Sequence, residues 1–345
     1  MKTILFCVNP YSFGILDSVM QVLKERKYEY IWFVREEIED KFPFKEEKYT
    51  TKIKDLITFK SDAIFSPGNE VPHYLRGVKT QVFHGLAGEK KGHFKIRSYF
   101  DLYLTQGPYF TRRFSKAALK HKNFKVVETG WPKLDVYGKE LHQYDSDKNQ
   151  LLTVHRASKV ILFAPTFSPS LTSAPYLLEQ MKLLAENKAY LIVIKFHDLM
   201  AQELIVTYKK LAIEVSNILF VEERNIIKYL LISDILISDT SSVVYEFLLL
   251  NKPVLTFKNN SKTCEWDNSL EYEGLEEKVN DNLQNDPYKE KRVSIVKEYH
   301  PYQDGKSSER MVHAVEDYIK EFGVPEKRTL PWLRRRKMNK MFGKY

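Results

Sequence analysis

The sequence predicts an α/β protein with two doubly wound, Rossmann-like domains that face each other across a cleft. Three observations lead to this prediction. The chain has 345 residues, enough for about two domains of ordinary size. Short apolar runs alternate with segments of helical periodicity in both halves, which is typical of parallel sheets. Between Gln143 and Val160 the chain becomes polar, which indicates a linker or variable loop.

A helix is expected early in the first half, because residues 14–26 place Ile15, Val19, Val22 and Leu23 at helical spacing. The strands expected in this half are 4–8, 30–34, 63–68 with its turn, 80–83 and 102–105. Each runs into a polar or Gly/Pro turn. Active residues should therefore lie at the carboxyl ends of the strands.

The same alternation restarts after the polar stretch. Strands are expected at 160–164, 190–195, 218–221, 235–238 and 253–257, and helices at 176–187, 202–214 and 243–250. We therefore expect one α/β domain over 1–150, a second over 151–326 and a basic amphipathic tail over 327–345.

The composition fits a globular protein in a reducing compartment. Hydrophobic residues make up 43% of the chain, and the two cysteines, Cys7 and Cys264, argue against a disulfide framework or a cysteine metal site. The apolar runs are shorter than the ~20 residues that a transmembrane helix needs. The N-terminal run has no obvious small-residue cleavage site, so we interpret it as a buried strand and not a signal peptide.

The net charge of +9 is concentrated at one end of the chain. Residues 327–345 contain eight of the 54 basic residues and no acid, which leaves residues 1–326 with 46 basic residues, 45 acids and a net charge of +1. A neutral body argues against nucleic-acid binding. The tail mixes cations with Trp, Leu, Met and Phe, which suits an anionic bilayer surface. A basic end without a partner is the alternative.

His84 directly follows a predicted strand and precedes Gly85. A histidine at this position suits a general base, and the glycine permits close approach of the backbone. The alternative is a structural histidine bonded to a neighbouring carbonyl.

A second cluster lies at strand ends in the other half. Lys195 and His197 alternate with apolar neighbours, so both should project from the same side of a strand end and suit a diphosphate. Two solvated residues are the alternative. Pro165 and Thr166, at another strand end, either line the site or simply end the strand.

The strongest local signal is a strand that ends at Asp239, followed by a turn of hydroxyl residues and a helix. The first N–H groups of that helix, with Thr240, Ser241 and Ser242, predict a phosphate cradle. Plain N-capping is the alternative. Glu246, one turn into the helix, is either a helix-dipole partner or an acceptor for a ribose hydroxyl.

Several motifs are missing from the sequence. It contains no Walker-type Gly-Lys-Ser/Thr loop, no His-Glu-x-x-His helix, no Gly-x-Ser-x-Gly elbow and no cysteine pair of metal-site spacing. Kinases, zinc hydrolases and serine esterases therefore lack support. We expect no metal site and no cofactor.

Taken together and in order, these segments resemble the CDP-glycerol glycerophosphotransferase family, the teichoic-acid primases and polymerases of the GT-B architecture. The similar segments are Phe83-His84-Gly85, Thr129-Gly130-Trp131-Pro132, Ala164-Pro165-Thr166-Phe167, Lys195-Phe196-His197-Asp198, Ser238 to Ser242 and Asp304 to Arg310. Three residues depart from the family pattern, where Phe83 replaces Trp, Asp198 replaces Pro and Thr240 replaces Tyr. The residues after His84 also differ, which leaves the acceptor more open than the donor.

The resemblance implies transfer of a polyol phosphate, foremost glycerol phosphate from CDP-glycerol with CMP leaving. The acceptor would be a hydroxyl of a glycan or lipid-linked molecule in teichoic-acid or capsule-like polymer synthesis. The first domain would hold the acceptor and the second the CDP-polyol. His84 would deprotonate or orient the acceptor hydroxyl, and the charge on the leaving side would be met by Lys195, His197, Ser241, Ser242 and Arg310. A metal is not obligatory for such a transfer.

The resemblance also favours a cytoplasmic enzyme held at the inner face of the cell membrane by its tail. One rival is a GT-B glycosyltransferase, or a related epimerase, that uses a nucleotide sugar. A rival of another class is a module whose basic tail binds a membrane or nucleic acid, and that binding would survive the loss of His84.

Overall fold

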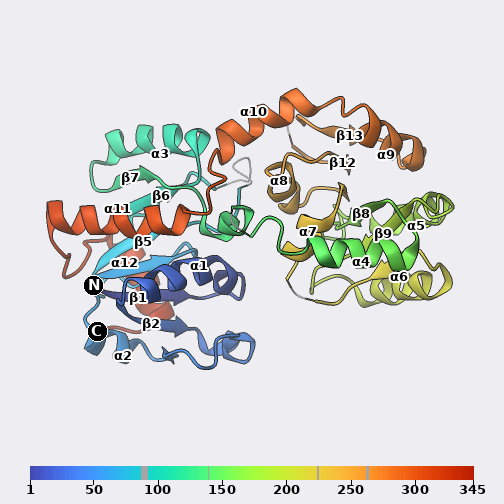
Figure 1. The fold of residues 1–345 in the computed structure, drawn as a ribbon. Helices are drawn as coiled ribbons and strands as arrows, with labels where there is room; N and C mark the ends of the chain where they lie inside the picture. Colours follow the sequence, from blue (N-terminus) through green and yellow to red (C-terminus); the bar gives the residue numbers. More distant parts are fainter. Residues whose placement is uncertain (87–91, 139, 224, 262–263) are drawn as a thin grey trace. The chain divides into compact units, whose positions relative to one another are not determined.

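The computed structural model describes residues 1–86, 92–138, 140–223, 225–261 and 264–345. The chain forms two compact units, Met1–Lys139 with Glu298–Tyr345, and Glu140–Lys297 (Figure 1). Each unit is a parallel sheet covered by helices, which confirms the predicted fold class. The expected boundaries after residues 150 and 326 differ from these units. The chain rejoins the first unit at Glu298, because the helix that follows packs against the first sheet.

The first unit holds a seven-stranded sheet of order β3-β2-β1-β4-β5-β6-β7, in which every neighbouring pair is parallel. Its strands are β1 Lys2–Cys7, β2 Glu29–Val34, β3 Tyr49–Thr50, β4 Ala63–Ser66, β5 Val78–Gln81, β6 Leu102–Thr105 and β7 Lys125–Glu128. Strand order reverses beside β1, which pairs with both β2 and β4. The loops after β1 and β4 therefore flank a topological switch point, where doubly wound sheets bind ligands.

Helices cover the first sheet because each presents an apolar face. Helix α1, for example, buries Ile15, Leu16, Val19 and Leu23, which recur at helical spacing. The helices of this unit are α1 Tyr11–Glu25, α2 Ile53–Phe59, α3 Pro108–His121, α11 Ser307–Phe322 and α12 Trp332–Phe342, with 3₁₀ turns η1 Glu36–Lys41 and η2 Pro132–Tyr137.

The second unit holds a six-stranded parallel sheet of order β10-β9-β8-β11-β12-β13. Its strands are β8 Lys159–Phe163, β9 Tyr190–Ile194, β10 Ile218–Phe220, β11 Ile235–Ser238, β12 Val254–Phe257 and β13 Asp267–Ser269. Its helices are α4 Asp145–His155, α5 Ala174–Leu184, α6 Gln202–Glu214, α7 Ile227–Ile232, α8 Val243–Leu248, α9 Leu275–Gln284 and α10 Lys289–Tyr299, whose last two residues belong to the first unit. The switch point here lies between β8 and β11.

Two sequence expectations about secondary structure were wrong or incomplete. The stretch expected as a linker contains helix α4, which buries no residue and therefore has no apolar periodicity to reveal it. A charged contact ties the helix to the rest of the unit, since Lys148 forms an ion pair with Asp234 at 2.8 Å. The short strands β3, β7 and β13 went unpredicted. They lie at sheet edges, where fewer apolar side chains are needed.

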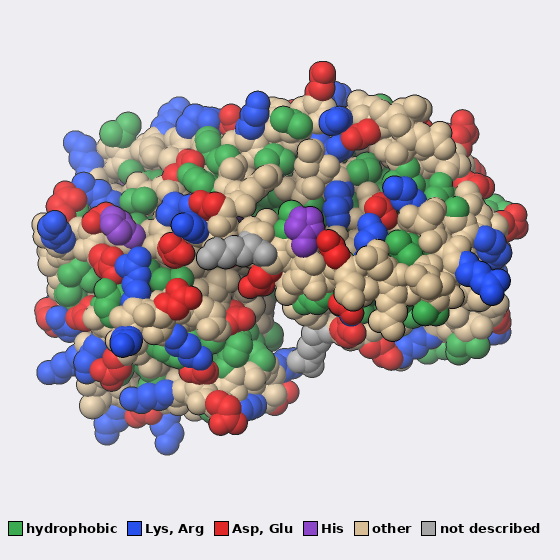
Figure 2. Space-filling view, in the orientation of Figure 1, with side chains coloured by type: hydrophobic (Ala, Val, Ile, Leu, Met, Phe, Trp, Pro, Cys, Tyr) green, Lys and Arg blue, Asp and Glu red, His purple; other side chains and the backbone are tan. Residues whose placement is uncertain are grey.

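The basic tail is a folded part of the first unit. Met338 and Phe342, two of the side chains expected to favour a bilayer, are buried, and the Phe342 ring lies 5.6 Å from that of Phe6 in β1. Trp332 and Leu333 are exposed. Figure 2 shows basic side chains interleaved with acidic ones over the visible face of this unit. Among the described residues, no helix is long and apolar enough to cross a membrane.

Candidate active site

His84 lies just beyond β5, beside the switch point of the first sheet. Its Nδ1 is 2.9 Å from the carbonyl oxygen of Pro67, in the turn after β4. Its ring stacks on Tyr11, which follows β1, with centroids 5.1 Å apart. A carbonyl can only accept, so Nδ1 donates the proton and Nε2 carries the lone pair in the neutral ring. The carbonyl bond expected of a structural histidine thus also leaves Nε2 of His84 able to accept a proton.

The backbone before His84 has an unusual conformation. Phe83 has a φ of 67°, in the left-handed region that bulky residues avoid. Its ring is buried and lies 5.0 Å from the ring of Phe114 in α3, measured between centroids. Gln81, also buried, donates from Nε2 to the carbonyl of Gly68 at 2.8 Å. The conformation of Phe83 and the bond from Gln81 to the turn after β4 therefore help to place the segment that leads into His84.

Gly85 has open space around it. A Cβ there would meet no described atom within 4 Å, so packing does not demand a glycine. Its carbonyl accepts a hydrogen bond from Gln106 Nε2 at 3.0 Å.

Lys195 and His197 follow β9 in the second unit and differ in exposure. Lys195 is only 6% exposed, and its Nζ donates to the carbonyl of Phe196 at 2.7 Å. Burial lowers its pKa, an effect that Asp198 and Glu223 oppose. The alternative that both side chains are solvated is therefore wrong for Lys195. His197 is exposed.

The protonation of His197 is opposite to that of His84. The N–H of Leu199 donates to its Nδ1 at 3.1 Å, so in the neutral ring Nε2 carries the proton and can donate. Partial desolvation of the ring lowers the pKa of His197, Asp198 opposes this change and Lys195 adds to it. The ring of Phe167 lies 4.5 Å away, between centroids. A neutral donor of this kind suits a phosphate oxygen.

Asp239 joins two strand ends of the second sheet. Its carboxylate accepts the N–H of Thr166 at 2.8 Å and, from Ser173, the N–H at 2.8 Å and the hydroxyl at 3.0 Å. Burial raises the pKa of Asp239 to about 6, although these bonds oppose the rise. The sequence predicts Asp239 only as the end of a strand, and no local signal predicts the role of Ser173. The predicted Pro165 and Thr166 lie in the loop that Asp239 holds.

The predicted hydroxyl turn follows Asp239 directly. Thr240 accepts the N–H of Asn260 at 3.1 Å through Oγ1, so its hydroxyl helps to hold a neighbouring loop. Ser241 and Ser242 are half-buried, and within the described residues Ser242 makes no side-chain capping bond to α8. Glu246 is buried on that helix. Plain N-capping therefore does not account for Ser242.

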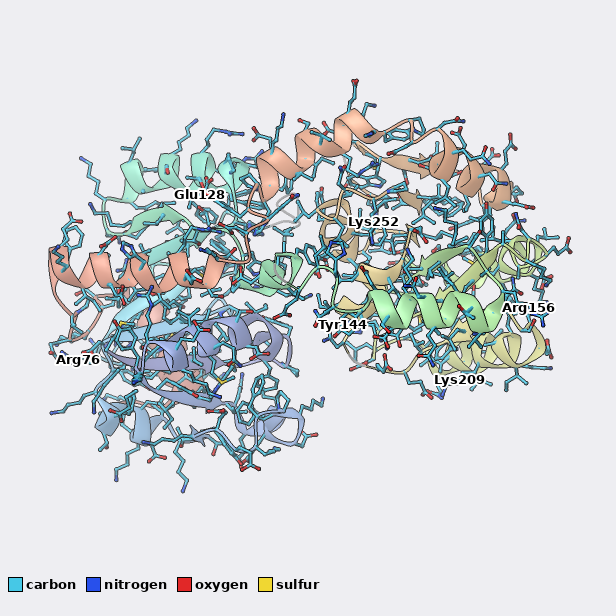
Figure 3. All side chains as sticks on the ribbon, viewed as in Figure 1. Arg76, Glu128, Tyr144, Arg156, Lys209 and Lys252 are labelled. Atoms are coloured by element: carbon cyan, nitrogen blue, oxygen red, sulfur yellow. The ribbon has the colours of Figure 1, made fainter. Side chains whose placement is uncertain are left out.

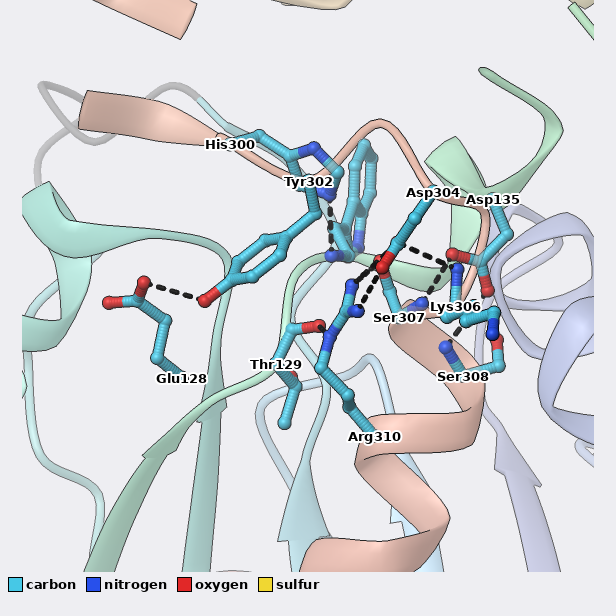
Figure 4. Close-up of polar contacts among 11 residues, drawn as sticks. Glu128, Thr129, Asp135, His300, Tyr302, Asp304, Lys306, Ser307, Ser308 and Arg310 are labelled. Atoms are coloured by element: carbon cyan, nitrogen blue, oxygen red, sulfur yellow. Dashed lines mark hydrogen bonds and ion pairs between the residues drawn. The ribbon is translucent and has the colours of Figure 1, made fainter. Parts of the chain in front are cut away.

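Arg310 belongs to helix α11 of the first unit (Figure 4). Its Nε donates to the carbonyl of Thr129 at 2.7 Å, and its Nη1 bonds Asp304 at 2.8 Å. Asp135 accepts the N–H groups of Ser307 and Ser308 at 2.7 and 2.9 Å. The late motif and the Thr129–Pro132 motif thus lock together within one unit. The expected contact of Arg310 with phosphate stays a prediction.

Gly130 is required by this lock. It has a φ of +87°, and a Cβ there would lie 2.4 Å from the hydroxyl of Ser307. Next to it, the Trp131 N–H donates to Nε2 of His300 at 2.9 Å, and burial lowers the pKa of His300 to about 4. The motif is therefore explained by packing.

Known proteins resemble this chain in sequence and fold. It is 30% identical over 271 residues to the teichoic acid ribitol-phosphate polymerase TarL of Staphylococcus aureus (strain NCTC 8325 / PS 47), covering 70% of this chain and 46% of that protein. It is 27% identical over 240 residues to the teichoic acid glycerol-phosphate primase of Bacillus subtilis (strain 168), covering 65% and 60%. The chain thus spans about half the length of these relatives.

The solved structure of the wall teichoic acid polymerase TagF superposes with a TM-score of 0.66 at 19% identity, covering 93% of this chain and 89% of that one. This likeness concerns the fold. The sequence profile of the CDP-glycerol:poly(glycerophosphate) glycerophosphotransferase family matches residues 2–317, nearly the whole chain. The chain therefore belongs to that family.

Proposed function

We propose that the protein transfers a polyol phosphate, foremost glycerol phosphate from CDP-glycerol, to a hydroxyl of a glycan or lipid-linked acceptor in teichoic-acid or capsule-like synthesis. The observation that carries the proposal is the pair of opposite histidine tautomers, an accepting Nε2 on His84 and a donating Nε2–H on His197. Family membership supports the donor class.

The reaction follows from these roles. The acceptor oxygen forms a bond to the phosphorus that carries the polyol, and the bond from that phosphorus to the bridging oxygen breaks. CMP leaves with the bridging oxygen, and the acceptor proton moves to Nε2 of His84. Lys195, the His197 N–H and the hydroxyls of Ser241 and Ser242 stabilise the phosphate charge. The loop that holds Pro165 and Thr166, and Glu246 on α8, complete the donor side, with Glu246 assigned to the ribose.

Glutamine variants separate the two histidine roles. A glutamine amide can replace a neutral N–H donor but cannot take a proton, so His197→Gln should retain CMP release that His197→Ala loses. His84→Gln should lose about 10²–10⁴-fold, the usual contribution of a general base. The measurement is CMP release from CDP-glycerol with a glycan or lipid-linked acceptor, with folding checked by circular dichroism. The reverse pattern would exchange the two roles.

The donor is tested by a thermal-shift panel of CDP-glycerol, CDP-ribitol and UDP- and GDP-linked sugars. Relatives named for ribitol phosphate and for glycerol phosphate make both CDP-polyols necessary arms. A shift with the CDP-polyols alone supports the proposal. A shift only with a nucleotide sugar would replace it with a glycosyltransferase or epimerase.

Peripheral attachment to the inner, anionic face of the cell membrane is the second part of the proposal. It rests on the outer face of α12, where Trp332 and Leu333 are 67% and 72% exposed beside Arg335, Arg336 and Lys340. Wild type should pellet with phosphatidylglycerol vesicles, and the double variant Trp332→Ala, Lys340→Met should pellet less. Equal pelleting would remove this part of the proposal.

A further inference from the structure

The loop between β4 and β5, residues 67–77, is covered by the end of the chain. Connections of this kind usually run over the surface, yet no residue of this loop is classed as exposed. Its cover is residues 325–345, here called the C-terminal strap. The Gly77 N–H donates to the carbonyl of Pro325 at 2.9 Å, and the Tyr74 hydroxyl donates to the carbonyl of Phe342 at 2.9 Å.

The strap reaches the part of the loop that orients His84. The loop begins at Pro67, whose carbonyl accepts the Nδ1–H of His84. Three residues further on, Glu70 forms an ion pair with Lys337 of α12 at 2.8 Å, and the Glu70 side chain is 21% exposed. At the far end of the loop lies Arg76, which is labelled in Figure 3. Its Nε forms an ion pair with Glu326 at 3.0 Å. The loop is thus tied to the strap at both ends.

The strap is itself anchored firmly. Arg328 is buried against Asp101 and donates to the carbonyls of Ser98 and Asn123, each at 2.7 Å. Met338 and Phe342 are buried in the first unit. Because a buried charge pair and two buried side chains hold the C-terminal strap in place, the strap can restrict the motion of the loop that it covers.

We propose that the C-terminal strap is a positioning element for His84, acting through the Glu70–Lys337 pair and the loop 67–77. The inference rests on the proposed role of His84 as base. A shift of ~1 Å in a reacting group can cost about a hundredfold in rate. The side of α12 that carries Lys337 therefore serves catalysis, whatever the rest of the helix contacts.

Charge variants test this link without removing the strap. Glu70→Lys and Lys337→Glu should each lower kcat for CMP release by about tenfold, with an unchanged KM for CDP-glycerol and an unchanged unfolding midpoint. The swap of both residues should restore kcat. Lys344→Glu is the matched control, because it makes the same charge change at another exposed position of the strap and should leave kcat unchanged.

A second readout does not depend on turnover. The ¹⁵N chemical shifts of the His84 ring should report one fixed tautomer, Nδ1–H, in the wild type and in Lys344→Glu, and a mixture of tautomers in Lys337→Glu. Unchanged kcat and shifts in both single variants would overturn the strap proposal, as would a loss that the swap fails to restore. If the wild type released no CMP, the function would fail while the shifts still tested the strap.

Discussion

Replacing Phe83 by glycine and, separately, by alanine tests the left-handed conformation that precedes His84. Both changes delete the same buried ring and its contact with Phe114, which costs about 3–5 kcal/mol for a core phenylalanine. The two variants differ only in the Cβ atom. Their difference in unfolding free energy therefore isolates the backbone from the packing.

The sign of this difference follows from φ. At a φ of 67° a non-glycine residue pays about 1–2 kcal/mol, whereas glycine pays only its extra chain entropy of about 0.5–1 kcal/mol. Phe83→Gly should therefore be more stable than Phe83→Ala by about 0.5–1 kcal/mol. At an ordinary negative φ the order would reverse.

Urea unfolding followed by tryptophan fluorescence gives the measurement, and the neighbouring Phe114 gives the control. Phe114 packs on Phe83 but lies within helix α3, where glycine is unfavourable. The Phe114→Ala variant should therefore be more stable than Phe114→Gly by about 1 kcal/mol. An alanine variant at position 83 as stable as the glycine variant would refute the strained turn. It would also remove the strain as a reason for the placement of His84.

Three further predictions concern buried polar groups. Asp239→Asn should lower the free energy of unfolding by about 1–3 kcal/mol and slow CMP release, because the amide nitrogen of asparagine cannot accept the hydrogen bonds that Ser173 donates. Urea unfolding measures the first effect and turnover the second. As pH falls from 6.5 to about 4, His300 takes up a proton in the unfolded chain but stays neutral where it is buried in the folded protein. The free energy of unfolding should therefore fall by up to about 3 kcal/mol over this range. A His300→Gln variant should show a flatter profile; an unchanged slope would exclude His300 as the source. Arg328→Met should lower the free energy of unfolding by about 3–5 kcal/mol, because it leaves the buried carboxylate of Asp101 without its charged partner. Adding Asp101→Asn should restore part of this stability, and thermal unfolding of both variants measures the difference.

The strands and the strand-end histidines could be predicted from sequence because their signals are local. An apolar run such as Leu191 to Ile194, followed by charged or polar residues, marks both a strand and its carboxyl end. His84, His197 and the hydroxyl turn after Asp239 all lie where that logic put them. The edge strands β3, β7 and β13 and helix α4 are not predicted in this way, because they bury little apolar surface.

The contacts that orient the site are long-range and leave no local pattern. Asp239 accepts hydrogen bonds from Thr166 and Ser173, which lie 73 and 66 residues away in the chain. The spacing of these residues in the sequence does not predict the bonds. The tautomers of His84 and His197 depend likewise on backbone groups that only folding brings near. Residue type predicts that a histidine can act as a base, whereas the bonding of its second nitrogen decides whether it does.

The basic tail shows why a charge count along the chain cannot assign a surface. Within residues 327–345 there is no acid, yet Arg328 and Lys337 pair with Asp101 and Glu70, which lie 227 and 267 positions away. The tail's excess of positive charge is therefore partly neutralised on one side by acids of the first unit. The proposed membrane contact therefore depends on the cations of the outer face, such as Arg336 and Lys340. One short helix can thus present a catalytic support on one side and a charged surface on the other, and variants of Lys337 and Lys340 distinguish the two.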